Sequence, residues 1–127
     1  MTFARINSGK KGEAIAADYL NKQGYKIIER NYRIALGEID IIAEDKGCIC
    51  FIEVRSVNSR TSGLAEETIS KIKQRQISKA ALAYIKKYRL EDRSCRFDAL
   101  CIRSVDSLKP EINFIKNAFE LNHRYSY

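Results

Sequence analysis

Two strand-like segments joined by a tight turn lie in the middle of the sequence and constrain its fold more than any other feature. Residues 38–44 alternate between polar and apolar side chains, and residues 48–55 form the most apolar strand-like segment. Lys46 and Gly47 lie between them, and glycine accepts the positive φ that a two-residue turn requires. The sequence therefore predicts an antiparallel hairpin in which Asp45 pairs with Cys48.

Helical and strand periodicity predicts the elements on either side of this hairpin. The order α-β-β-β-α-β-β indicates an α/β fold, in which a mixed β-sheet is flanked by helices. The expected helices are 10–23 and 64–87, and the further strands are 25–32, 96–103 and 111–117.

The composition indicates one globular domain with an anionic partner. The chain has 127 residues, of which 45% are hydrophobic and 31% are charged. This length and balance fit a single domain over 1–127, with a core at about 10–118 and a mobile tail at 119–127. Twenty-three Lys and Arg exceed sixteen Asp and Glu, which gives a net charge of +7 and favours nucleic acid as the partner.

The chain shows no secretory or membrane-spanning pattern. Its first residues contain no apolar stretch after the basic ones, and no apolar run approaches the length that crosses a bilayer. We therefore expect a cytoplasmic protein without a membrane partner. In that compartment the four cysteines are expected to be free thiols, with a zinc site or a disulfide as the alternatives.

Two carboxylates fall on one face of the predicted hairpin. In the expected register Asp40 lies opposite Glu53, and Glu38 lies opposite Arg55. Like charges directly across a strand pair repel each other. Mg²⁺, which usually takes one or two protein carboxylates, would neutralise them. The alternative is a surface ion-pair cluster in which Arg55 serves both acids.

Charged side chains on the two predicted helices point to the same region. Glu13 lies on the apolar stripe of the first helix, where it is either a first-turn acid stabilised by the helix dipole or a group directed at the sheet. Lys73 lies among apolar neighbours on the second helix in the same way. The opposite face of that helix carries a basic arc, which is either a solvated surface or a phosphate-binding stripe.

The motifs that carry these features resemble a known family. The string GEAIAADYLNKQGYKIIERNYR is followed by GEIDIIAED, FIEVRS, a Lys-rich helix and RFD, in an order that spans residues 12–102. This pattern resembles the YraN-like family of predicted nucleases. That family is grouped with the PD-(D/E)XK, or restriction-endonuclease-like, superfamily and is similar to archaeal Holliday junction resolvases.

The resemblance implies a restriction-endonuclease-like fold and metal-dependent hydrolysis of DNA, branched DNA included. Asp40 and Glu53 would hold Mg²⁺ or Mn²⁺. The implied catalytic residues are Glu13, Asp40, Glu53 and Arg55, with Glu38 and Lys73 in support. Superfamily members usually have a lysine where this chain has Arg55. Arginine keeps its proton at ordinary pH, so it holds a phosphate or orients a hydroxide instead of acting as a base.

This departure leaves more than one function open. The first is the endonuclease, and the second is a nucleic-acid-binding module that keeps the fold but has weak or no catalysis. A structural or regulatory protein with a basic surface is the third. The similarity to resolvases also implies a homodimer. The residues expected to contact nucleic acid are Lys10, Lys11, Arg60, Lys71, Arg75 and Lys79.

Overall fold

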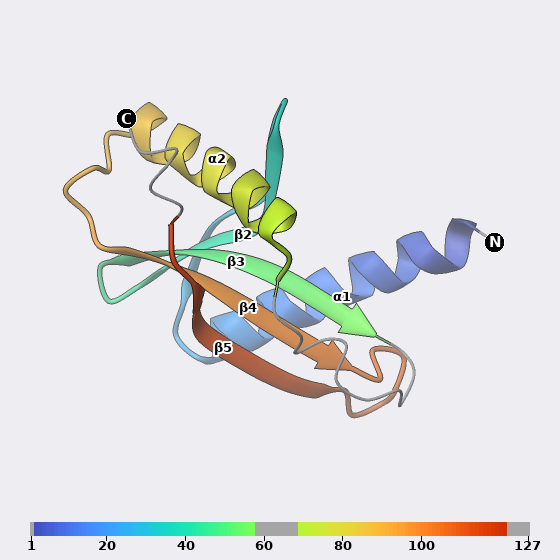
Figure 1. The fold of residues 1–127 in the computed structure, drawn as a ribbon. Coiled ribbons are helices and arrows are strands. Elements are labelled where there is room, and N and C mark those ends of the chain that lie inside the picture. The colour runs from blue at the N-terminus through green and yellow to red at the C-terminus, as the bar shows by residue number, and fades with distance from the viewer. Residues whose placement is uncertain (1, 58–68, 122–127) are drawn as a thin grey trace.

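Five strands form one mixed sheet, and two helices complete the fold (Figure 1). The structure is a computed structural model that describes residues 2–57 and 69–121. Neighbouring strands are antiparallel except for the parallel pair β3–β4, and the spatial order is β1-β2-β3-β4-β5. The predicted element order is therefore confirmed. The elements are α1 (Thr2–Lys22), β1 (Lys26–Ile34), β2 (Gly37–Asp45), β3 (Cys48–Val57), α2 (Lys71–Lys87), β4 (Cys95–Arg103) and β5 (Glu111–Phe119).

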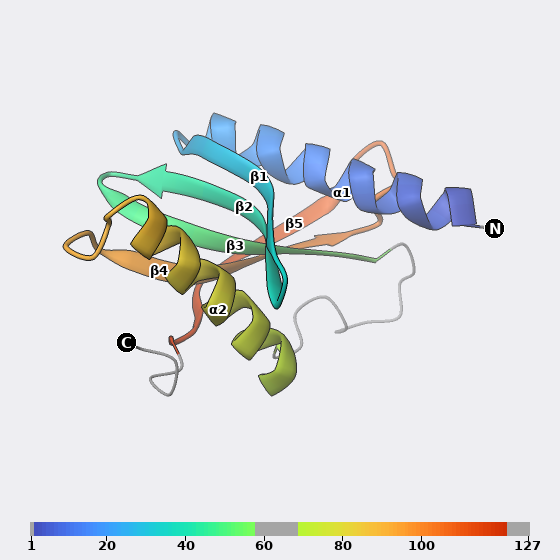
Figure 2. The same cartoon turned by 90° about the horizontal axis from the view of Figure 1, so that it is seen from above.

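The two helices cover opposite faces of the sheet, as Figure 2 shows. A parallel pair of strands needs a crossover connection, and α2 lies in the connection between β3 and β4. Each helix buries its own apolar cluster against the sheet. The α1 cluster includes Ala16, Leu20, Ile41, Ile52 and Leu100, and the α2 cluster includes Ile39, Phe51, Ile77, Tyr84 and Phe97. Neither helix of the described residues is long and apolar enough to cross a membrane.

The β2–β3 hairpin has the predicted register. Asp45 pairs with Cys48, and the pairing continues in step to Ile41 and Ile52. The turn residues Lys46 and Gly47 both have positive φ, at 50° and 86°. A local turn signal therefore sets the alignment of the two central strands.

Three predicted boundaries differ from the structure. The first helix begins at Thr2 instead of residue 10, so Glu13 lies mid-helix and the first-turn interpretation is excluded. The prediction of a helix running through Ile69 and Ser70 is wrong, because the Ser70 hydroxyl accepts a hydrogen bond from the Lys73 N–H at 3.1 Å and caps α2 there. The expected tail also begins later, since Phe119 still belongs to β5. Residues 122–127 lie outside the described part.

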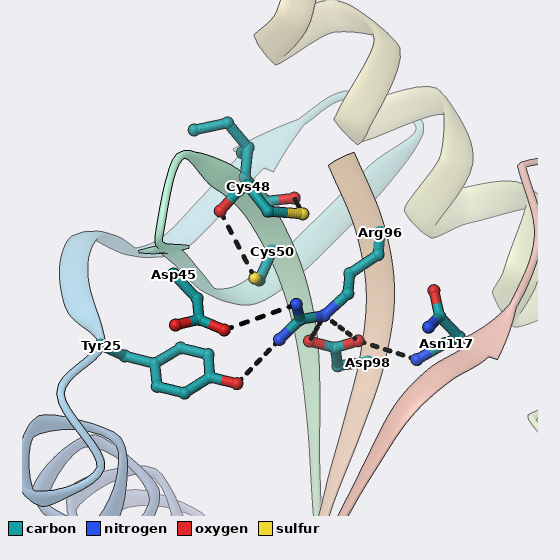
Figure 3. A network of polar contacts seen from close by, with 8 residues as sticks. Tyr25, Asp45, Cys48, Cys50, Arg96, Asp98 and Asn117 are labelled. Atoms are coloured by element: carbon teal, nitrogen blue, oxygen red, sulfur yellow. Dashed lines mark hydrogen bonds and ion pairs between the residues drawn. The ribbon is translucent and has the colours of Figure 1, made fainter. Parts of the chain in front are cut away.

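A buried polar network centred on Asp98 of β4 joins this strand to its neighbours (Figure 3). Asp98 is fully buried, and the Arg96 guanidinium donates to its two oxygens at 3.0 and 2.9 Å. The same guanidinium donates to the Tyr25 hydroxyl at 2.7 Å. Asp98 also accepts from the backbone N–H of Asn117 at 2.9 Å, where β5 takes a left-handed residue and shifts register against β4. One carboxylate therefore holds an arginine and an irregular edge strand in place.

Removal of this carboxylate should destabilise the protein strongly. Asp98→Ala leaves the Arg96 guanidinium, only 14% exposed, without its principal partner. Removal of one partner of a buried ion pair costs about 3–5 kcal/mol, and Asp45, 3.6 Å from the Arg96 Nη1, offsets only part of this loss. We expect a decrease of this size in the free energy of unfolding, measured by urea denaturation followed by circular dichroism.

Asp18→Ala is the matched control. Its carboxylate forms an i,i+4 pair with Lys22 at 3.0 Å, but the side chain is 65% exposed. Loss of an exposed pair costs less than about 1 kcal/mol. Equal destabilisation by the two substitutions would contradict a special role for Asp98.

Candidate functional site

The site lies where β2 and β3 separate. The expectation that Asp40 pairs with Glu53 across the ladder is wrong in detail, because the paired residues end at Ile41 and Ile52. Beyond that point the Asp40 Oδ2 accepts a hydrogen bond from the Val54 N–H at 2.8 Å. A side chain thus replaces the next backbone bond between the strands. This contact holds the Asp40 carboxylate against β3, beside Glu53.

β1 is irregular at the same level of the sheet. Asn31 has a φ of 55°, and the β1–β2 pairing passes over Asn31 and Asp40 without joining them. Ile39 then packs with Ile42 on the α2 face, whereas Ile41 packs on the α1 face. Strict alternation along residues 38–44 would place Ile39 and Ile41 on one face, and the structure places them on opposite faces. The change of facing occurs at Asp40, which lies between them.

Glu53 is the more buried member of the acid pair. Its side chain is 11% exposed and lies on the α2 face, with the Lys73 Nζ at 3.9 Å from its Oε1. Burial, a hydrogen bond with the Asp40 carboxyl and the negative charge of Asp40 raise the pKa of Glu53 to about 8, against the opposing charges of Lys73 and Arg55. The Glu53 carboxyl therefore holds its proton more tightly than an ordinary glutamate does.

Glu13 approaches Asp40 from α1, on the other face of the sheet. Its carboxyl is half-buried, and burial together with the negative charge of Asp40 raises its pKa, while a hydrogen bond to the Asn31 side chain lowers it. The α1 backbone is close to β3 at this level, since a side-chain carbon added at Gly12 would lie 2.9 Å from the Ser56 Oγ. The predicted inward orientation of Glu13 is confirmed, and three acids from α1, β2 and β3 converge.

Glu38 has a partner that the sequence did not predict. Glu38 pairs with Arg33 across the β1–β2 ladder, and the Arg33 Nε lies 3.3 Å from its Oε2. Arg55 acts on the acid pair, because its charge lowers the pKa of Glu53. Arg55 thus acts on Glu53, one of the two acids that the ion-pair alternative assigns to it.

The basic residues predicted to contact nucleic acid are divided between the two helices. Lys10 and Lys11 belong to α1, where the Lys11 Nζ forms an ion pair with Asp106 at 3.0 Å. Lys71 and Arg75 are exposed on α2, at the end that also carries Lys73. Lys79 is half-buried, and Arg60 lies outside the described residues.

The donor groups suit a hard divalent cation. Within residues 2–57 and 69–121, no three or more His, Cys, Asp and Glu side chains are grouped to hold a metal. Asp40 and Glu53 provide two carboxylates, which is the number of protein ligands that Mg²⁺ commonly uses while it keeps several waters. All four cysteines are free thiols. The residues present therefore fit Mg²⁺ or Mn²⁺ better than Zn²⁺.

Two parts of the site are missing from the sequence-based prediction. One is Asn31, whose side chain contacts Glu13 and whose backbone interrupts the strand. Asparagine enters the left-handed region more readily than most residues, so an Asn within a strand-like segment was a usable signal. The other is the Val54 N–H, a backbone group whose role does not depend on the type of residue at this position.

Comparison with known proteins identifies close relatives. The model of the Uncharacterised protein family UPF0102 matches residues 12–102, a range that contains all three converging acids and Lys73. A UPF0102 protein of Trichlorobacter lovleyi is 49% identical over 114 residues, which cover 89% of this chain and 90% of the relative. UPF0102 proteins of Geotalea uraniireducens and Geobacter metallireducens are 47% and 46% identical, and cover 89% and 95% of this chain and 89% and 98% of their own length.

Glu53 should make the stability of the metal-free protein depend on pH. The folded state holds the Glu53 proton more tightly than the unfolded chain, whose pKa is near the ordinary 4.5. The protonated Glu53 therefore stabilises the fold fully below a pH of about 4.5, and this stabilisation is lost as the pH rises through about 8. The slope from one such group is at most about 1.4 kcal/mol per pH unit. Urea denaturation in EDTA, repeated at pH values between about 4.5 and about 8, measures this slope of the free energy of unfolding.

Glu53→Gln should remove this component and be more stable than the wild type at the alkaline end. Glu111→Gln, at an exposed position on β5, serves as the control and should keep the wild-type slope. Parallel pH profiles for the wild type and Glu53→Gln would contradict the assignment.

Proposed function

We propose that this chain, which belongs to the UPF0102 family, is a metal-dependent endonuclease that hydrolyses phosphodiester bonds of DNA. Family membership confirms the YraN-like resemblance of the motifs, while the family's name states no activity. The observation that carries the proposal is the acid pair at the separated end of β2 and β3. There the Val54 N–H holds Asp40, and Glu53 is crowded against it.

Asp40 and Glu53 would hold the cation. A like-charged pair with a raised pKa is unfavourable for folding, and such perturbed groups are concentrated at functional sites. When bound there, a divalent cation supplies an activated water at neutral pH and neutralises charge on the phosphoryl oxygens. Glu13, on the side of Asp40 nearer to α1, would accept a hydrogen bond from water at the outer edge of the site.

Two cations next to the acid pair would take different parts in the reaction. Arg55 has a planar guanidinium that suits two phosphoryl oxygens at once, and it does not release a proton at ordinary pH. The Lys73 ammonium, 3.9 Å from Glu53, is a group that can lose a proton. We therefore assign phosphate binding to Arg55 and the positioning of the attacking water to Lys73. In this chain α2 would thus supply the lysine that β3 lacks.

The charge distribution supports a nucleic-acid substrate. The chain carries a net charge of +7, and exposed Lys71 and Arg75 continue along α2 from Lys73. Cations arranged beside a carboxylate site attract the phosphates on both sides of the bond to be cleaved. The similarity of the motifs to those of resolvases extends the proposal to branched DNA and to the PD-(D/E)XK superfamily.

Arg55 also favours a second candidate function. If hydrolysis requires a lysine at this strand position, the chain is a DNA-binding module with the nuclease fold and without turnover. The module would bind DNA with strong salt dependence and without need for a metal ion. The position of Lys73 beside Glu53 favours the enzyme over the module.

Cleavage assays test the endonuclease. We expect the protein with Mg²⁺ or Mn²⁺ to cut at least one of single-stranded, duplex, flap and four-way-junction DNA, and EDTA to abolish cutting. Asp40→Asn and Glu53→Gln should each lower kcat/KM at least about 100-fold, because each removes a charged ligand. Initial rates on 5′-labelled substrates measure this effect.

Asp18→Asn is the matched control, since its carboxylate is exposed on α1 and pairs only with Lys22 among the contacts described. It should cleave at the wild-type rate. Cleavage that persists in Asp40→Asn and Glu53→Gln, or no cleavage of any substrate by the folded wild type, would overturn the proposal.

Substitution of the two cations separates the enzyme from the module. Lys73→Gln should lower kcat by about 100-fold, the scale of a positioned catalytic group. Arg55→Lys should retain activity and bind DNA more weakly, because a lysine holds fewer phosphoryl oxygens at once. Single-turnover cleavage and fluorescence anisotropy measure the two effects. An inactive wild type that gains cleavage in Arg55→Lys would favour the binding module.

A further inference from the structure

A pocket of about 400 Å³ lies between the tip of the β1–β2 hairpin and α2. Residues 34–36 at the hairpin tip form an apolar wall, and Arg33, Lys73 and Gln76 form a polar one. The pocket adjoins the acid pair through Lys73, which lines it and also lies 3.9 Å from Glu53. A ligand in this pocket would therefore lie next to the proposed site of hydrolysis.

The hairpin tip is seated tightly on α2. A side-chain carbon at Gly37 would overlap the Gln76 carbonyl oxygen, so the backbones of the hairpin and the helix approach closely there. Beyond this contact the tip projects from the sheet past α2 (Figures 1 and 2). Leu36 at the tip is 63% exposed, although leucine is a residue that proteins usually bury. The hairpin therefore presents an apolar side chain on a supported backbone.

The charges at the pocket suit a phosphate. Arg33 and Lys73 bring two positive charges, and Glu38 brings one negative charge through its pair with Arg33. The Arg33 side chain is 70% exposed, and an ion pair open to solvent in this way is weak. Arg33 can therefore release Glu38 and bind a phosphate with little loss of free energy. An apolar wall beside a cationic wall matches the base and the phosphate of one nucleotide.

We infer that this pocket binds one unpaired nucleotide of a DNA strand, next to the bond that is cleaved. Its phosphate contacts Arg33 and Lys73, and the face of its base lies against Leu36 and its neighbours on the tip. A base inside a duplex has both faces covered by stacking, so only an unstacked base presents a free face to the tip. The pocket thus selects single-stranded segments, such as flaps and the open centre of a junction. This inference rests on the proposed function for the position of the cleaved bond.

Binding without cleavage tests the pocket. Fluorescence anisotropy in EDTA compares three labelled probes: a short single strand, the same strand with abasic sites in place of its bases, and the corresponding duplex. The single strand should bind about fivefold more tightly than the abasic strand, because only the strand with bases can cover the exposed Leu36 side chain. Equal affinity for the single strand and the abasic strand would overturn the inference.

Two substitutions, one in each wall of the pocket, should change the affinities for the probes in different ways. Leu36→Ala should remove the preference for the strand with bases and leave the affinity for the abasic strand unchanged. Arg33→Ala should weaken binding of both strands by a similar factor, since both have phosphates. The matched controls are Leu108→Ala and Lys109→Ala, at exposed positions between β4 and β5 and away from the pocket. Both should bind all three probes as the wild type does.

The binding measurements test the pocket, and the cleavage assay tests the endonuclease, so either proposal can be contradicted while the other stands. If Mg²⁺-dependent cleavage requires Asp40 but Leu36→Ala keeps the base preference, the inference is wrong and the endonuclease stands. If the base preference depends on Leu36 but no substrate is cleaved, the pocket stands and the endonuclease is wrong. Similar effects from Leu108→Ala and Leu36→Ala would also overturn the inference, because the apolar contact would then be non-specific.

Discussion

One hydrogen bond, from the Val54 N–H to the Asp40 carboxylate, determines how the candidate site is built. Without it, the ends of β2 and β3 would either continue their ladder or leave a buried N–H unpaired, which costs about 1–3 kcal/mol. Because a side chain makes this bond, the strands can separate while the sheet stays joined. The same bond places one carboxylate beside Glu53 and within the electrostatic reach of Glu13. The geometry of the acids therefore depends on a backbone group.

Two acids of this sheet are strongly buried, and they differ in the groups that surround them. Asp98 accepts from the Arg96 guanidinium and from the Asn117 N–H, so its charge is matched by donors on every side that the structure describes. Glu53 faces another carboxyl, and its nearest cation is 3.9 Å away. A buried carboxylate that accepts hydrogen bonds from its neighbours is compatible with a stable fold. A carboxylate next to another carboxyl group lowers the stability of the fold unless a ligand neutralises the charge. This contrast, more than burial, supports the role proposed for Glu53.

The sequence predicts the central hairpin well because its signals are local. A turn at Lys46 and Gly47 and the strand alternation suffice for the register, and the register brings Asp40 near Glu53. Alternation fails at Ile39, since the left-handed Asn31 that changes the facing lies on a neighbouring strand. The pocket beside α2 was not predictable either. It depends on the approach of Gly37 to a helix distant in the sequence, and no periodicity encodes that approach.

The position of the site at the separated strand ends also explains why the two helices can both contribute to it. A side chain on the face of a continuous sheet contacts the helix that covers that face and is screened from the other. At the gap beside Asp40 the sheet no longer separates its two sides, so Glu13 from α1 and Lys73 from α2 act on the same carboxyl pair. A cation supplied by α2 does not require a lysine on β3. Arg55 can therefore occupy that strand position while the site keeps a lysine.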